Sequence, residues 1–327
     1  MSSARHLIAI DQGTTSTRTV LFNDQGQPLF NSQTEFTQLF PEDGWVEHNP
    51  EEIWQSVLST CREVIAESHK LGGSIAGLGI TNQRETTIIW DKQTGQPIYN
   101  AIVWQDRRTA DFCQSIASEK NKRLVTQKTG LILDPYFSAS KIAWLLEHVA
   151  GAREKANQGN LLFGTVDTFL IWHLTAGKSH VTDASNASRT MLFNIHTQTW
   201  DDELLALFHI PKGLLPTVLD NCDDFGKTDK HLFGAEIPIT GVAGDQQAAT
   251  IGQACFKAGM AKSTYGTGCF VMMNTGSKII QSKVSLLSTI AYRLKGKVTY
   301  ALEGSIFNAG TTVQWFRDKA HLIKDAK

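Results

Sequence analysis

The sequence predicts an α/β protein, because apolar runs of β-type residues alternate with amphipathic helical stretches along most of its 327 residues. Near the N-terminus, residues 8–22 contain two β-rich pieces around a turn of Gly, Thr and Ser residues, which is typical of a hairpin. A third strand is expected after the turn at residues 23–26. A helix follows, and a further strand at residues 75–81 comes directly after it, which is the order of elements in α/β domains.

The predicted helix has a recognisable start, apolar face and end. Asn49 is a favourable N-cap, Pro50 suits the first turn, and the two glutamates that follow complement the helix dipole. Gly72 and Gly73 are expected to end the helix. One apolar stripe would face the core, and it consists of Ile53, Val57, Cys61, Val64 and Ile65.

The composition is that of an ordinary globular protein, with 41% hydrophobic and 19% charged residues. A net charge of -1 gives no reason to expect a nucleic-acid or membrane partner. The apolar runs are too short for a signal peptide or a membrane-spanning helix. The five cysteines are widely spaced and form no Cys-x-x-Cys pair, which favours reduced thiols in a cytoplasmic protein.

Two Gly-Thr turns that lie far apart in the sequence resemble each other. Residues 11–15 are Asp-Gln-Gly-Thr-Thr, and residues 265–269 are Tyr-Gly-Thr-Gly-Cys. Each turn lies in a predicted hairpin. The two are either unrelated hairpins or equivalent parts of two similar lobes that face one cleft.

The first of these turns contains residue types that bind phosphate. Small residues let backbone amides approach a phosphate closely, and Thr14, Thr15 and Ser16 add hydroxyl donors. Asp11 could hold Mg²⁺ through water, and Arg18 supplies a fixed positive charge. The alternative is a plain polar hairpin with an ion pair. The sequence contains no Walker loop and no Gly-x-Gly-x-x-Gly fingerprint.

A polar cluster follows the strand predicted at residues 75–81. Asn82, Gln83, Arg84 and Glu85 stand at its carboxyl end, the edge at which open α/β sheets bind ligands. An arginine donates and a glutamate accepts hydrogen bonds, which suits a polyol because its hydroxyls do both. The alternative is a surface ion pair of little energetic value.

Two aromatic residues are candidates for the walls of such a pocket. Trp104 and Tyr136 could pack their faces against a carbon backbone, and the tyrosine hydroxyl adds a donor. Each of them could equally be an ordinary core residue.

Asp245 is the carboxylate of most interest for catalysis. A β-type run leads into Gly244 and Asp245, and the residues from Gln246 onward predict a helix through Ile251. A carboxylate at such a junction could accept the proton of an attacking hydroxyl as a general base. The alternative is a helix N-cap, for which aspartate is a preferred residue.

The segments that carry these features resemble the glycerol kinase branch of the sugar kinases, which share the actin and hexokinase ATPase fold. The match runs in register from about Ile8 to the end of the chain. The matching blocks are IAIDQGTTSTR, GWVEHNPEEIW, ITNQRET, FGTVDTFLIWHLT, NASRTMLFNIHT, GDQQAA, TYGTGCF and LEGSIF. The chain also contains a segment that resembles the wider sugar-kinase signature, namely Tyr136-x-Ser138-x-x-Lys141-Ile142-x-Trp144-Leu145.

The resemblance implies an ATP-dependent phosphorylation of glycerol, with Asp245 as the general base and Mg²⁺ held with the help of Asp11. It implies a glycerol site lined by Arg84, Glu85, Trp104, Tyr136, Asp245, Gln246 and Phe270. It implies nucleotide-side positions at Thr14, Thr15, Ser16, Arg18, Gly266, Thr267, Gly310 and Gln314.

The resemblance also implies a division of the chain into two parts. Residues 1–253 would form a ribonuclease H-like, actin-like lobe with the glycerol site, and residues 254–327 would begin a nucleotide-binding lobe of the same type. Because members of this family are longer, we expect the second lobe to be incomplete. We therefore expect this chain alone to be inactive or very weak as a kinase, and the full-length enzyme to be a cytoplasmic homo-oligomer. The alternatives are a kinase for another small sugar, such as a pentulose, and a non-catalytic polyol-binding or regulatory fragment.

Overall fold

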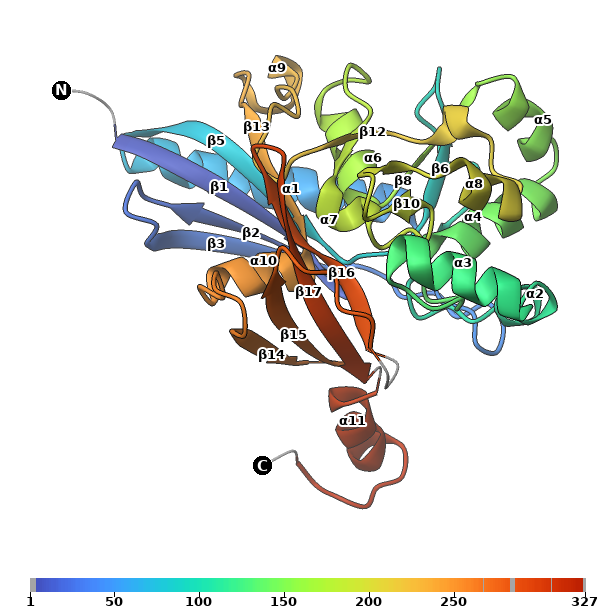
Figure 1. The fold of residues 1–327 in the computed structure, drawn as a ribbon. Coiled ribbons are helices and arrows are strands. Elements are labelled where there is room, and N and C mark those ends of the chain that lie inside the picture. The colour runs from blue at the N-terminus through green and yellow to red at the C-terminus, as the bar shows by residue number, and fades with distance from the viewer. Residues whose placement is uncertain (1–3, 267, 283–285, 307, 326–327) are drawn as a thin grey trace.

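The computed structural model describes residues 4–266, 268–282, 286–306 and 308–325. Two β-sheets, each made from a different part of the chain, dominate the structure (Figure 1). The N-terminal sheet has the strand order β13-β5-β1-β2-β3, and the C-terminal sheet has the order β14-β15-β17-β16.

The N-terminal sheet combines an antiparallel and a parallel part. β1, β2 and β3 form consecutive antiparallel pairs, whereas β1, β5 and β13 run parallel to one another. Its strands are β1 (Ala4–Gln12), β2 (Ser16–Phe22), β3 (Pro28–Glu35), β5 (Gly73–Asn82) and β13 (Ile239–Gly244). The hairpin, the third strand and the strand after the helix, all predicted from the sequence, are therefore confirmed.

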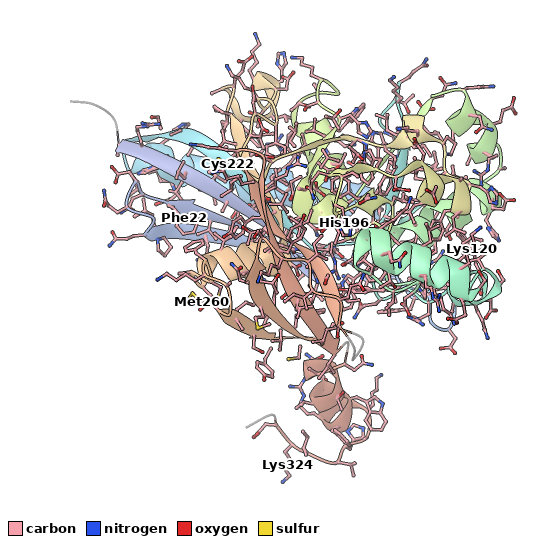
Figure 2. The ribbon with its side chains drawn as sticks, viewed as in Figure 1. Phe22, Lys120, His196, Cys222, Met260 and Lys324 are labelled. Carbon is pink, nitrogen blue, oxygen red and sulfur yellow. The ribbon has the colours of Figure 1, made fainter. Side chains whose placement is uncertain are left out.

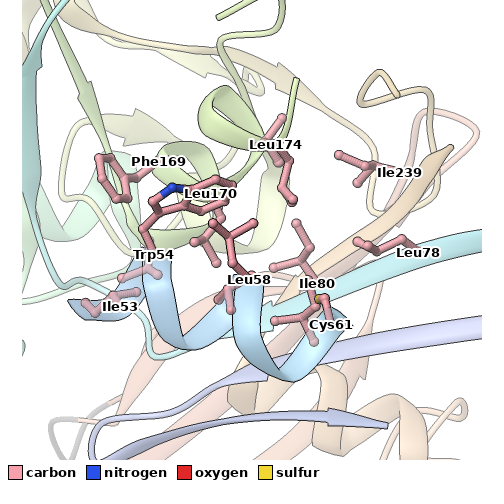
Figure 3. Close-up of a cluster of buried hydrophobic side chains, with 14 of the residues drawn as sticks. Ile53, Trp54, Leu58, Cys61, Leu78, Ile80, Phe169, Leu170, Leu174 and Ile239 are labelled. Atoms are coloured by element: carbon pink, nitrogen blue, oxygen red, sulfur yellow. The ribbon is translucent and has the colours of Figure 1, made fainter. Parts of the chain in front are cut away.

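Helix α1 (Pro50–Lys70) covers one face of this sheet, where it packs against β1, β2, β3 and β5. Its start is the predicted one, because the side chain of Asn49 accepts a hydrogen bond from the amide of Glu51 at 2.9 Å. The apolar stripe predicted on α1 is buried along its whole length. Figure 3 shows Trp54, Leu58 and Cys61 of α1 facing the side chains of α6 and β5 in one apolar cluster.

The chain between β5 and β13 forms a mixed region of short elements beside the N-terminal sheet (Figure 1). Its short strand pairs are β6 (Ile88–Asp91) with β8 (Leu161–Gly164), β9 (Val181–Asp183) with β12 (Thr217–Leu219), and β10 (Phe193–Asn194) with β11 (Thr199–Trp200), while β7 (Ala101–Ile102) pairs with β4 (Glu47–His48), which precedes α1 in the chain. Its helices are α2 (Ala110–Ser115), α3 (Glu119–Thr129), α4 (Ser138–His148), α5 (Ala152–Asn157), α6 (Val166–Leu174), α7 (Ala184–Ala187), α8 (Asp202–Leu207), α9 (Lys230–Phe233) and a 3₁₀ turn at Lys212–Leu214. A second apolar core, separate from the one under α1, holds this region together.

The C-terminal sheet follows helix α10 (Asp245–Gly252) and is entirely antiparallel. Its strands are β14 (Ala261–Tyr265), β15 (Cys269–Gly276), β16 (Leu287–Leu294) and β17 (Lys297–Ile306), and helix α11 (Gly310–Asp318) comes after them. Figure 2 marks this part of the chain with Met260, immediately before β14, and Lys324, after α11. Within the described chain β14 is paired only with β15, and Val271 and Ile306 are exposed, as expected for strands with an open edge and an uncovered apolar face.

The register of the parallel strands places three chain segments at one edge of the N-terminal sheet. Gln12 at the end of β1 and Gly244 at the end of β13 both lie opposite Asn82 at the end of β5. The residues that follow these strand ends therefore leave the sheet side by side. They are the first Gly-Thr turn, the pair Arg84–Glu85 and the residue Asp245.

Two histidines, the buried His48 and the half-buried His173, make the stability of this fold sensitive to acid. Burial lowers the pKa of His48 to about 3. Burial also lowers the pKa of His173 to about 4, against a small opposing effect of Glu51. Because the unfolded chain takes up protons on these imidazoles near the ordinary pKa and the folded chain does not, stability is lost as the pH falls below about 6.5.

We expect the free energy of unfolding, measured by urea denaturation, to fall by about 2 kcal/mol for each of these histidines between pH 7 and pH 5. The variant His48→Gln should remove its share of this pH dependence, whereas His231→Gln, at an exposed position, should leave the slope unchanged. An identical slope in both variants would contradict this assignment.

Candidate active site

A small pocket of about 160 Å³ lies where the strand ends of the N-terminal sheet meet the C-terminal sheet. Its walls come from both Gly-Thr turns, from the end of β5, from the mixed region and from α10. The lining residues are Thr14, Thr15, Arg84, Glu85, Trp104, Tyr136, Asp245, Gln246, Thr264, Gly266, Gly268 and Phe270. The structure thus brings together every residue predicted for the glycerol site, and the two turns do face one pocket.

Arg84 is the centre of the polar contacts in this pocket. Its guanidinium is buried and donates to both carboxylate oxygens of Glu303, at 2.5 and 3.1 Å. Its Nε lies 3.3 Å from Oδ1 of Asp245, and its Nη2 lies 3.3 Å from the hydroxyl of Tyr136. The two contacts to Glu303 form the bidentate arrangement that holds an arginine most firmly. The longer contacts are to Asp245 and Tyr136, which both line the pocket.

Glu303 lies in the middle of β17, and its carboxylate also accepts a hydrogen bond from Nη2 of Arg189 at 2.8 Å. Burial by itself would raise the pKa of Glu303, but the charges of Arg189 and Arg84 outweigh it and lower the pKa to about 2. The carboxylate is therefore ionised at neutral pH. Its contacts cross from the C-terminal sheet to residues that come from the N-terminal part of the chain.

Glu85 is the second buried carboxylate in this network. Its Oε1 accepts a hydrogen bond from Nε of Arg189 at 2.6 Å and lies 3.7 Å from Nε of Arg84. Burial raises the pKa of Glu85, while the two arginines act in the opposite direction. Its backbone φ is +60°, which is uncommon for a residue with a side chain and costs of order 1–3 kcal/mol. The surface ion pair considered for Arg84 and Glu85 is therefore wrong, because both side chains are almost fully buried.

Three aromatic side chains form the apolar wall of the pocket. The ring of Trp104 meets those of Tyr136 and Phe270 edge to face, with centroids 5.9 and 5.8 Å apart. The indole nitrogen of Trp104 donates a hydrogen bond to the hydroxyl of Thr14 at 2.9 Å. The apolar wall is thus tied directly to the first Gly-Thr turn.

Asp245 is the first residue of α10, and Gly244 occupies the N-cap position. The alternative interpretation of Asp245 as the N-cap is therefore wrong. Its Oδ1 accepts a hydrogen bond from the amide of Gln246 at 2.7 Å, and its Oδ2 accepts one from the side-chain amide of Gln246 at 3.0 Å. The side chain is 36% exposed, so the carboxylate remains accessible from the pocket.

Four further nucleotide-side residues, Ser16, Arg18, Gly310 and Gln314, lie outside the pocket lining. Arg18 forms an ion pair with Asp11 at 3.1 Å, and the hydroxyl of Ser16 accepts a hydrogen bond from Gln33 at 2.9 Å. Gln314 is exposed on α11. Gly310 adjoins the second Gly-Thr turn, because its amide donates to the carbonyl of Gly266 at 2.9 Å. Thr267 lies outside the described residues.

The surroundings of Asp11 are compatible with the predicted Mg²⁺ site, but the described residues alone do not supply a full set of metal ligands. The described part of the chain contains no group of three or more His, Cys, Asp or Glu side chains placed to hold a metal ion. Burial raises the pKa of Asp11, Arg18 lowers it, and the charge of Asp245 raises it. A single carboxylate suits Mg²⁺, which keeps several waters and takes its other ligands from phosphates.

Three charged residues of the site were missed from the sequence: Arg189, Lys262 and Glu303. All three side chains are buried. Glu303 and Lys262 each stand within a strand, and an ionisable residue in a strand that packs into the core is a signal of a paired charge. Arg189 follows a run of small residues and carries no comparable signal in the sequence.

Residues 6–252 match the FGGY family of carbohydrate kinases, N-terminal domain. The chain belongs to the FGGY family of carbohydrate kinases. The glycerol kinase of Marinomonas sp. (strain MWYL1) is 61% identical over 322 residues, which are 98% of this chain and 65% of that protein. The glycerol kinase of Coxiella burnetii (strain RSA 493 / Nine Mile phase I) is 61% identical over 321 residues, which are 98% of this chain and 64% of that protein. The chain thus spans about 65% of the length of these FGGY relatives.

Solved FGGY structures confirm the predicted α/β fold, which is that of the actin-like ATPases. Plasmodium falciparum glycerol kinase, solved with ADP, superimposes with a TM-score of 0.93 at 40% identity and covers 99% of this chain and 65% of that one. A gluconate kinase from Lactobacillus acidophilus, at 22% identity, superimposes with a TM-score of 0.86 over 99% of this chain and 64% of its own, which shows the fold alone. In the described part of the chain, no helix has the length and apolar character needed to cross a membrane.

Removal of one charge from the buried ion pairs of the site should destabilise the protein much more than removal of one charge from an exposed ion pair. We expect Glu303→Gln to lower the free energy of unfolding by about 3–5 kcal/mol, because it leaves two buried arginines with one fewer carboxylate. The matched control is Glu119→Gln, which removes an exposed ion pair with Lys122 and should cost less than about 1 kcal/mol. Urea denaturation of both variants measures the difference, and equal effects would show that removing this negative charge from beside the two buried arginines carries no penalty.

Proposed function

We propose that this chain carries the polyol site and part of the nucleotide site of a kinase that transfers the γ-phosphoryl group of ATP to glycerol, forming glycerol 3-phosphate. The observation that carries the proposal is the position of Asp245. Its carboxylate lies in the pocket beside Arg84, and the two Gly-Thr turns line the same pocket. The identity to glycerol kinases across almost the whole chain supports glycerol as the substrate.

The polyol would lie against the wall formed by Trp104, Tyr136 and Phe270. Aromatic faces pack against its carbon atoms, while Arg84 donates to and Glu85 accepts from its hydroxyls. The small volume of the pocket favours a short polyol over a longer sugar. The nearly complete burial of these groups also keeps water away from the reacting hydroxyl.

Asp245 would act as the general base for the attacking hydroxyl. A carboxylate oxygen can accept several hydrogen bonds, so the contacts that it receives from Arg84 and Gln246 leave capacity for the substrate proton. Arg84 would fix the direction of the carboxylate, because it is itself held by Glu303. Such positioning is the main contribution that a protein makes to phosphoryl transfer.

The nucleotide phosphates would lie between the two Gly-Thr turns. Thr14, Thr15 and Gly266 would face them. We assign the other nucleotide-side roles that the resemblance implies to Ser16, Arg18, Thr267, Gly310 and Gln314. When bound, Mg²⁺ would neutralise charge on the phosphate oxygens, and Asp11 would help to hold it through water.

We further propose that residues 1–253 form the polyol-binding lobe and that residues 254–327 belong to the nucleotide-binding lobe. The extent of the family match, which ends at residue 252, supports this division.

Glycerol binding and phosphoryl transfer are best tested in two separate assays. Calorimetry on this chain should show glycerol binding more tightly than xylulose or gluconate. Because the chain spans 65% of the Marinomonas relative, transfer is best assayed with this chain fused to the unmatched part of that relative. Tighter binding of xylulose would favour a pentulose kinase, and glycerol binding with no transfer in the fusion would favour a non-catalytic polyol-binding role.

We expect Asp245→Asn in the fusion to lower turnover by about 10²- to 10⁴-fold while leaving the Kd of glycerol almost unchanged. An amide retains the shape of the side chain but cannot accept the proton of the hydroxyl. Turnover is measured by ADP release and the Kd by calorimetry. Retained turnover would exclude Asp245 as the base.

Gly244 provides a second prediction, because a methyl group there would lie 2.8 Å from Cγ and Cδ of Arg84. We expect Gly244→Ala to displace Arg84 and to weaken glycerol binding by about tenfold, the value of one hydrogen bond to a charged group. The matched control is Gly252→Ala on the same helix, where no heavy atom lies within 4 Å of the added methyl group. Equal affinities of the two variants would show that the position of Arg84 does not matter for binding.

A further inference from the structure

Lys262 has three hydrogen-bond partners next to the proposed polyol site. It lies on β14 of the C-terminal sheet, and its side chain is buried. Its ammonium donates to the side-chain oxygen of Gln246, to the hydroxyl of Thr264 at 2.9 Å and, more weakly, to the carbonyl of Phe270 at 3.5 Å. Three acceptors for three ammonium protons hold the side chain in one orientation.

The contact with Gln246 decides which way that side chain faces. An ammonium group only donates, so the oxygen of the Gln246 amide must point to Lys262. The amide nitrogen then points away, and it donates to Oδ2 of Asp245 at 3.0 Å. The chain of contacts Lys262–Gln246–Asp245 thus connects the C-terminal sheet to the carboxylate at the start of α10.

The series of contacts from Lys262 through Gln246 acts on one particular oxygen of the Asp245 carboxylate. Oδ1 is held by the amide of Gln246 and by Nε of Arg84. Within the described part of the chain, Oδ2 accepts its hydrogen bond from the side-chain amide of Gln246. Without Lys262 that amide could rotate by 180° and turn its oxygen toward the carboxylate, which would repel it.

We propose that Lys262 is a positioning residue, which orients the side-chain amide of Gln246 so that it donates to Asp245 and fixes the carboxylate that faces the polyol. This inference rests on the proposed function for its consequence in turnover, because Asp245 is taken there as the general base. The orientation of the Gln246 amide is a separate consequence that needs no ligand.

The charges around Lys262 agree with this role. Burial lowers the pKa of Lys262 to about 8, and Arg84 lowers it as well, while Asp245, Glu303 and Cys269 raise it. Lys262 therefore loses its charge at a lower pH than an exposed lysine. The protonated amine is the form that can only donate, so the orientation of Gln246 should weaken as the pH rises through about 8.

The experiment compares Lys262→Met and Lys262→Arg with the parent chain and with the control Lys257→Met, at an exposed lysine. Chains labelled with ¹⁵N at glutamine side-chain amides report the hydrogen exchange of the Gln246 amide, which Gln246→Leu assigns. We expect exchange about tenfold faster in Lys262→Met than in the parent, because one hydrogen bond to a charged group is lost. Lys262→Arg should restore most of the protection, and Lys257→Met should match the parent.

The second measurement is the turnover of the fusion with the unmatched part of the Marinomonas relative, followed by ADP release. We expect turnover about tenfold lower in Lys262→Met, and the double variant with Gln246→Leu should turn over no more slowly than Gln246→Leu alone. Additive losses would mean that Lys262 does not act through Gln246 and would overturn the inference. Unchanged amide exchange in Lys262→Met would overturn it too. If the parent chain does not bind glycerol, the proposed function fails, while the amide exchange still decides the role of Lys262.

Discussion

The bidentate ion pair between Arg84 and Glu303 joins the two sheets, and the geometry of the pocket depends on it. Arg84 leaves the N-terminal sheet at the end of β5, and Glu303 lies within β17 of the C-terminal sheet. Both side chains are buried, so neither charge can be satisfied by water. The partners must meet for either to be tolerated, which fixes how the C-terminal sheet sits over the strand ends.

The buried charges of this region are balanced against one another rather than paired in isolation. Arg84 and Arg189 share Glu85 and Glu303, and Asp245 lies at the open side of the same group. Such a network is costly to assemble, because each ion loses its hydration, and it confers geometric definition more than stability. The unusual backbone at Glu85 fits this view, since strain of this kind is found where surrounding contacts over-determine a conformation.

Local patterns in the sequence were sufficient to predict the N-terminal elements, because hairpin turns, a helix cap and an apolar stripe depend on neighbouring residues. The identity of the pocket residues followed from the resemblance to glycerol kinases together with the position of Arg84 at a strand end. The roles of Glu303, Arg189 and Lys262 could not be predicted in this way. The arginine partners of Glu303 lie 219 and 114 residues away in the sequence, and only the packing of β17 over the first sheet brings them into contact. The contact of Lys262 with Gln246 depends on the packing of β14 against α10. The surface ion pair considered for Arg84 was wrong for the same reason, since burial is a property of the whole fold.

The hydrogen bond from the Trp104 indole to Thr14 has a consequence for how the two halves of the pocket communicate. One end of this contact belongs to the apolar wall and the other to the first Gly-Thr turn, which we propose faces the phosphates. A rearrangement of that turn that breaks the hydrogen bond would disturb the wall, so a ligand in one half of the pocket would alter the free energy of binding in the other half. Thermodynamic linkage makes this influence equal in both directions, which means that neither binding constant is a property of its own subsite alone.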